Sequence, residues 1–190
     1  MIQTKQKTHL LANARVYLCG PIENSNEPIN WRDKASAELS KLGMVVWNPL
    51  VKPFWMSDID GKRQREMRDK LHIHEIKLHN HSVRLLGLHL VANCDIVLLR
   101  INGEPTIGTY EELSVAKYKP VICWCDEDVP SMWLVDQLNC YDYPHYVFHR
   151  SINDIMSYLR KVDSGVIDVP DRFRWSFVTY GDNYNKIWSK

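Results

Sequence analysis

Short apolar runs alternate along the chain with longer segments that have a helical repeat. The runs are rich in Val, Ile, Leu and aromatic residues and are bounded by Gly, Pro or Asn, which is typical of buried strands. Five strands are therefore expected: "ARVYLCG" (14–20), "MVVW" (44–47), "DIVLLRI" (95–101), "PVICWC" (120–125) and "HYVFH" (145–149).

The segments between these runs have the spacing of amphipathic helices. Over 29–42 the apolar residues recur on one face, and Gly43 supplies the stop. Further helices are expected over 62–93 (as one helix or two), 109–118, 130–138 and 152–161.

Strands that alternate with helices predict an α/β protein. We expect a doubly wound, mainly five-stranded parallel sheet with helices on both faces, flavodoxin/Rossmann-like. Ligands of such sheets bind beyond the carboxyl ends of the strands, so loops 20–22, 48–49 and 102–108 should share one edge. Residues 1–162 are expected to form this domain, and residues 163–190 an aromatic extension that packs on the domain or on a partner subunit.

Composition narrows the function classes. A net charge of +1 provides no global field for nucleic acid or membrane. No apolar run is long enough to span a bilayer, and the apolar core of residues 1–15 is too short for a secretory signal. The five cysteines are scattered and odd in number, which predicts a reducing, cytoplasmic compartment.

Metal binding is not expected from the spacing of the potential ligands. Five histidines crowd residues 72–89, but they lie at helical spacings too wide for one ion.

The main chemical question is the role of Glu112 in the stretch "EPTIGTYEELSVAK" (104–117). Thr109 and Glu112 fit a capping box, in which each side chain bonds the other residue's amide. Alternatively, the amino end of the helix holds the Glu112 carboxylate ionised, and an ionised, oriented carboxylate is a nucleophile for an electron-poor sugar carbon. The residues alone leave both interpretations open.

Three segments together resemble the nucleoside 2-deoxyribosyltransferase-like family. The match covers about residues 16 to 121 and rests on Tyr, Gly-Pro, Asn-Pro, Gly-Thr-x-x-Glu and Lys-Pro-Val elements in the family's order. The segments are "VYLCGPIENSNEPINWRDKASAELSKLGMVVWNP", "VRLLGLHLVANCD" and "CDIVLLRINGEPTIGTYEELSVAKYKPV".

The resemblance implies cleavage or transfer of the N-glycosidic bond of a (deoxy)nucleoside or nucleotide, without a cofactor. Glu112 would attack the anomeric carbon, and Tyr17 would orient it. A free nucleobase would accept the sugar in transfer, and water in hydrolysis. The resemblance also implies a homodimer or higher oligomer. Substrate contacts would come from Gly20, Pro21, Ile22, Asn48, Arg84, Thr106, Gly108, Ser131 and Asn139.

Two positions depart from the family pattern. Gly87 stands where the family helix usually carries an acid near the sugar, which puts catalysis in question and makes a non-catalytic nucleotide-binding module an alternative. Thr106 stands where the transferases tend to have a base-reading Asp and the nucleotide hydrolases have Ser. That hydroxyl favours the alternative of a (deoxy)nucleoside 5′-monophosphate N-glycoside hydrolase.

Overall fold

The structure of the chain is a computed structural model, which describes residues 9–22, 29–52, 66, 69–70, 73–101, 106–125, 146–169 and 173–179. The strands are β1 (Arg15–Cys19), β2 (Val45–Trp47), β3 (Ile96–Ile101), β4 (Val121–Cys125) and β5 (Tyr146–His149). The helices are α1 (Asn30–Ser40), α3 (Ile73–Asn93), α4 (Ile107–Val115) with the 3₁₀ turn η2 (Ala116–Tyr118), α6 (Ile152–Asp163) and α7 (Ser176–Thr179).

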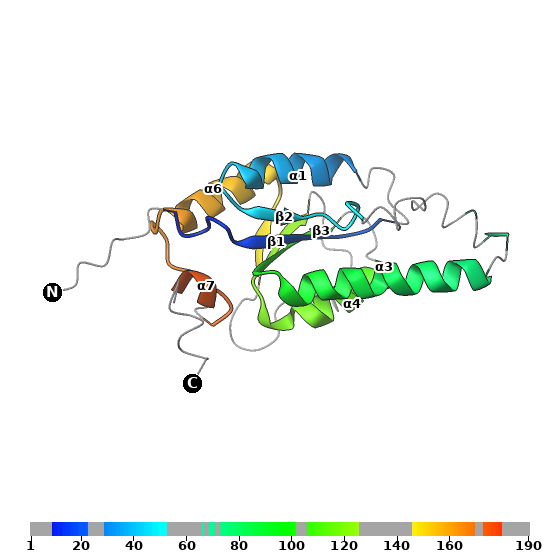
Figure 1. The fold of residues 1–190 in the computed structure, drawn as a ribbon. Helices are drawn as coiled ribbons and strands as arrows, with labels where there is room; N and C mark the ends of the chain where they lie inside the picture. Colours follow the sequence, from blue (N-terminus) through cyan, green and yellow to red (C-terminus); the bar gives the residue numbers. More distant parts are fainter. Residues whose placement is uncertain are drawn as a thin grey trace, which may run out of the picture.

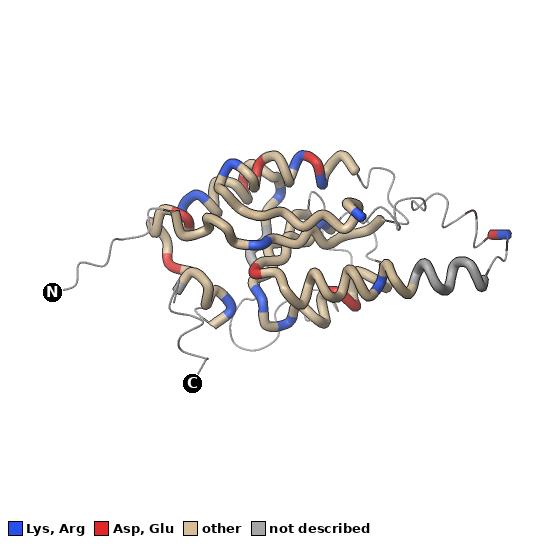
Figure 2. The backbone as a smooth tube through the Cα atoms, in the orientation of Figure 1, with Lys and Arg blue, Asp and Glu red and all other residues tan. Residues whose placement is uncertain are grey.

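The strands form one parallel sheet in the order β2-β1-β3-β4-β5. This is the flavodoxin-like order, and the predicted α/β class is confirmed. Helices α1 and α6 cover one face of the sheet, and α3 and α4 cover the other (Figure 1). Figure 2 shows Lys and Arg interspersed with Asp and Glu along α1 and α6.

Each strand lies within its predicted run, whereas the helix boundaries differ more. Helix α4 begins at Ile107, two residues before the predicted start, and α6 continues to Asp163. The described part of the 62–93 region contains the long helix α3, and residues 66 and 69 before it are also helical. The predicted helix over 130–138 lies outside the described residues. No helix among the described residues is both long and apolar enough to cross a bilayer.

Strand β1 divides its side chains between two cores. Val16 and Leu18 belong to the α1/α6 layer, the buried cluster between the sheet and those helices. Tyr17 and Cys19 belong to the α3/α4 layer on the opposite face. This alternation follows from the period of two along a strand, and it directs Tyr17 and Cys19 toward α4.

The segment 173–179 packs on the α1/α6 layer. Trp175 is buried; its ring meets that of Tyr158 edge-on at a centroid distance of 6.5 Å and stacks on Phe177 at 5.7 Å. The aromatic extension predicted over 163–190 stays a prediction as a whole. The division at residue 163 stays a prediction.

Asp163, at the end of α6, anchors the start of the described chain. Its buried carboxylate accepts from the Leu11 amide at 2.8 Å and contacts His9 Nδ1 at 2.9 Å. The Leu10 amide donates to the Asp163 backbone carbonyl at 3.1 Å.

Replacement of Asp163 by Ala should therefore lower the free energy of unfolding by about 2 kcal/mol, because the Leu11 amide loses its charged acceptor in a buried place. Urea denaturation measures this change. Asp168→Ala, which removes an exposed carboxylate from the segment that follows, is the matched control. Equal effects of the two substitutions would contradict the anchoring role.

Candidate active site around Glu112

Glu112 lies in the second turn of α4 and takes no part in capping it. The N-cap of this helix is Thr106, in extended backbone with φ −80° and ψ 162°, and its side chain makes no capping hydrogen bond. Thr109 is therefore inside the first turn, where it is buried and its hydroxyl lies 3.2 Å from that of Thr106. The predicted capping box between Thr109 and Glu112 is wrong.

The Glu112 carboxylate instead reaches across to β1. The Tyr17 hydroxyl donates to Oε1 at 2.6 Å, and the Cys19 thiol donates to Oε2 at 3.0 Å. The structure thus brings Glu112 and Tyr17 together, as the resemblance implied. The Cys19 contact was missed, because the sequence pattern treats this residue as a small hydrophobe. Its position two residues after Tyr17, on the same strand face, is the signal that could have found it.

Gly87 of α3 lies close to the carboxylate. A Cβ at this position would lie 3.2 Å from Glu112 Oε1 and 3.5 Å from the Tyr17 hydroxyl oxygen. Position 87 therefore lies beside Glu112, and the absence of a side chain there lets the carboxylate approach α3 closely.

Burial raises the pKa of Glu112. The hydrogen bonds from Tyr17 and Cys19, and then the charge of Arg32, act in the opposite direction, while Glu111 adds to the rise. The expectation that the amino end of the helix holds the carboxylate ionised is not supported, because the dipole acts within the first turn, which begins at Ile107.

Both donors to Glu112 keep their protons at neutral pH. Burial, followed by the proximity of Glu112, raises the pKa of Tyr17 well above its ordinary value of 10.0. The same two causes raise the pKa of the Cys19 thiol well above 9.0. The carboxylate is thus held by two protonated donors.

Arg32 is a fully buried cation behind this site. Its guanidinium donates to the carbonyl of Gly20 at 2.8 Å and to that of Pro21 at 3.4 Å, and it lies 4.3 Å from the centre of the Trp31 ring. It thereby secures the turn that follows β1. The helical repeat gave no sign of it, because an arginine in such a pattern is ordinarily solvated.

The Gly20 turn also approaches β3 closely. A Cβ at Gly20 would lie only 2.9 Å from the Arg100 carbonyl oxygen, so this position requires glycine. Ile22 follows as a half-buried residue, and the Asn48 side chain accepts from the Leu50 amide at 3.0 Å, which closes the turn after β2. These turns follow the carboxyl ends of β1 and β2, at the edge where a ligand was expected.

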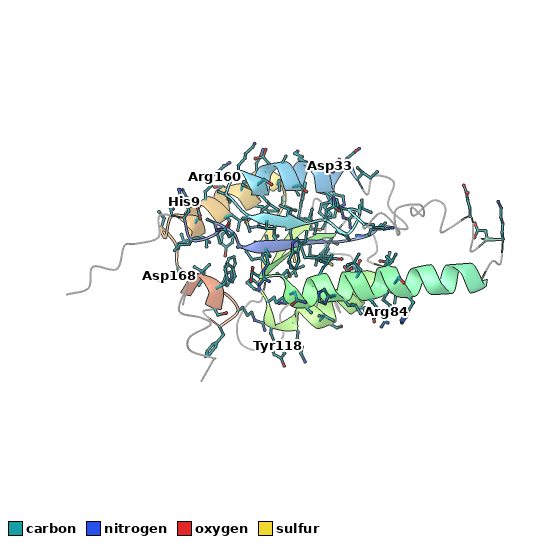
Figure 3. All side chains as sticks on the ribbon, in the orientation of Figure 1. His9, Asp33, Arg84, Tyr118, Arg160 and Asp168 are labelled. Atoms are coloured by element: carbon teal, nitrogen blue, oxygen red, sulfur yellow. The ribbon has the colours of Figure 1, made fainter. Side chains whose placement is uncertain are left out.

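Arg84 does not contact Glu112. It lies on the side of α3 turned away from the sheet (Figure 3), and its guanidinium donates to both carboxylate oxygens of Glu111 on α4. Thr106 and Gly108 stand at the start of α4, with Gly108 exposed. The substrate contacts assigned to these residues stay predictions.

Two predicted contacts, Ser131 and Asn139, lie outside the described residues. Within the described ranges, no group of three or more His, Cys, Asp or Glu side chains could hold a metal ion. Of the histidines on α3, His81 and His89 are exposed.

Comparison with known proteins shows what fold the chain shares. No model of a protein family matches the sequence, and neither does any curated protein. Among solved structures, the chain is similar to the 2-deoxyribosyltransferase of Bacillus psychrosaccharolyticus, with 21% identity and a TM-score of 0.52 over 76% of this chain and 92% of that one. A CMP N-glycosidase of Clostridium botulinum matches with 14% identity and a TM-score of 0.44 over 77% and 98% of the two chains. The first likeness shows that this chain has the fold of a 2-deoxyribosyltransferase.

Proposed function

We propose that the chain is a nucleoside 2-deoxyribosyltransferase-like enzyme that cleaves the N-glycosidic bond of (deoxy)nucleosides or nucleotides, with Glu112 as its nucleophile. The observation that carries this proposal is the 2.6 Å hydrogen bond from the Tyr17 hydroxyl to Glu112 Oε1. Cys19, the last residue of β1, contacts the same carboxylate, so the pair lies at the carboxyl end of the sheet, where such folds bind ligands.

In this mechanism the ionised Glu112 carboxylate forms a bond to the anomeric carbon while the bond from that carbon to the base nitrogen breaks. The base takes the bonding electron pair and gains a proton from solvent, which stabilises it as a leaving group. A second base, or water, then attacks the same carbon and releases Glu112. Tyr17 holds one carboxylate oxygen throughout and so limits the rotation of the nucleophile.

The same residues would serve a (deoxy)nucleoside 5′-monophosphate N-glycoside hydrolase. The observation that favours this second candidate is the neutral Thr106 hydroxyl at the N-cap of α4, where it can meet a base or a phosphate without adding charge. In this case water replaces the acceptor base.

Incubation with a panel of deoxynucleosides, nucleosides and their 5′-monophosphates, with and without a free acceptor base, separates these functions. A new nucleoside formed only with the acceptor indicates transfer, and free base formed in water alone indicates hydrolysis. Nucleotide-dependent thermal stabilisation without turnover would indicate a binding module and would overturn the proposed enzyme.

Replacement of Tyr17 by Phe should lower kcat/KM about 10- to 100-fold, because the nucleophile loses a hydrogen bond to a charged group. The pKa of Glu112 should also rise, so the acid limb of the pH profile should move to higher pH. Tyr158→Phe is the matched control, because the Tyr158 hydroxyl is buried without a hydrogen-bond partner among the described residues. Unchanged kinetics of the Tyr17 variant would contradict its orienting role.

A further inference from the structure

The Cys19 thiol is fully buried, and it donates to the oxygen of Glu112 that Tyr17 does not bind. A carboxylate turns easily about its terminal torsion, which has a broad, two-fold profile. One donor at Oε1 still allows the group to turn about that contact. A second donor at Oε2 fixes the plane of the carboxylate, which decides where its lone pairs point.

Helix α3 limits the space beside Oε1. A Cβ at position 87 would lie 3.2 Å from Oε1, which is closer than ordinary van der Waals contact. The carboxylate is therefore held by two hydrogen bonds from β1, and a side chain at position 87 of α3 would crowd its Oε1.

We propose that Cys19 is a second positioning residue for Glu112, and that a thiol at this place orients the nucleophile while leaving it reactive. A thiol is a weak hydrogen-bond donor, whereas a hydroxyl is a stronger one. Cys19 thus fixes the plane of the carboxylate with little loss of its basicity. The inference deepens the proposed function and rests on it.

The pH dependence of the reaction separates this role from simple packing. The titratable and charged groups that act on the Glu112 carboxylate are Tyr17 and Cys19 on β1, Arg32 on α1 and Glu111 on α4. Gly87 brings no ionisable group from α3. Since the thiol hydrogen bond favours the ionised form, the strength of the donor at position 19 should set the position of the acid limb.

Cys19→Ala and Cys19→Ser should therefore move the acid limb in opposite directions. The Ala variant loses the donor, so its limb should shift to higher pH and its plateau kcat/KM should fall about 3- to 10-fold. The Ser variant gains a stronger donor, so its limb should shift to lower pH while its plateau stays within about 3-fold of the wild type. Shifts of both variants in the same direction, or of neither, would overturn the proposal.

Cys123→Ala and Cys123→Ser provide the matched control. Cys123 is an equally buried free thiol in the same layer, on β4, and has no hydrogen bond to Glu112. These variants should lose stability as the Cys19 variants do, and their acid limbs should stay at the wild-type position. A shift of the limb in the Cys123 variants would show that the effect comes from repacking of the layer and would overturn the proposal.

Infrared spectroscopy tests the contact without turnover. Subtraction of the spectrum of Glu112→Gln isolates the carboxyl bands of Glu112, and their pH dependence gives its titration in the wild type and in the two Cys19 variants. Opposite shifts in these titrations without any cleavage of nucleosides would support the inference and refute the proposed function. Identical titrations in the three proteins would overturn the inference even if the enzyme is active.

Discussion

Replacement of Glu112 by Gln is expected to lower kcat/KM by at least about 10⁴-fold, the scale seen when a covalent nucleophile is removed. The amide has the shape of the carboxylate and can still accept from the Tyr17 hydroxyl, but it cannot form the glycosyl ester. Chromatographic turnover assays with the best substrate of the panel measure this loss. Activity within about 10-fold of the wild type would refute the nucleophile assignment.

The same variant should become more stable than the wild type as the pH rises. Burial raises the pKa of Glu112 above its ordinary value of 4.5, so the folded state holds this proton more tightly than the unfolded chain does. The stability that the carboxyl contributes is complete below pH 4.5 and is lost as the pH rises through the folded-state pKa. Glutamine does not titrate, so the difference in unfolding free energy should grow over this range.

Glu111→Gln is the control for both measurements. This neighbouring acid is paired with Arg84 on the outer side of α3 and α4, and its pKa is lowered by that hydrogen bond. The control should keep its activity. Its stability relative to the wild type should not increase with pH, because a lowered pKa gives stability that is present above 4.5 and lost in acid.

Replacement of Arg32 by Met should destabilise the protein by about 3 kcal/mol or more, because removal of a buried, hydrogen-bonded cation leaves its partners unsatisfied. The Gly20 and Pro21 carbonyls lose their donor, and Glu112 loses a nearby positive charge. Burial lowers the pKa of Arg32 to about 10, so the side chain is still a cation at neutral pH. Urea denaturation measures the loss of stability.

Activity provides a second measurement for Arg32→Met. Without this charge the pKa of Glu112 should rise further, and the acid limb of kcat/KM should move to higher pH. Lys34→Met removes the same charge from the exposed side of α1 and is the control. If Arg32→Met were as stable and as active as Lys34→Met, the support of the Gly20 turn would have to come from elsewhere.

The architecture was predictable because it depends on regular patterns. Buried parallel strands need continuous apolar runs, and each of the five strands falls inside such a run. The boundary of α4 was less predictable, since both Thr106 and Thr109 are suitable capping residues and the local sequence does not choose between them. The tertiary contact from β1 decides where Glu112 points.

The site was predictable only in part, because its members come from four separate elements, β1, α1, α3 and α4. The resemblance identified the Glu112–Tyr17 pair, and the structure places the two side chains in contact. Cys19 and Arg32 act through contacts that hydrophobic periodicity cannot predict. In such a pattern a cysteine is taken for an ordinary core residue, and an arginine for a surface residue. Arg84 lay on the expected helix, but the face it occupies brings it to Glu111.

The four cysteines among the described residues, Cys19, Cys94, Cys123 and Cys125, all lie in the α3/α4 layer, whereas the buried cluster of the α1/α6 layer has none. Alkylating reagents reach a buried sulfur only when the surrounding structure opens. With Cys140 replaced, the rate of thiol labelling would therefore measure how often the α3/α4 layer, on the side of Glu112, opens. Opening of the α1/α6 layer alone would not change this rate.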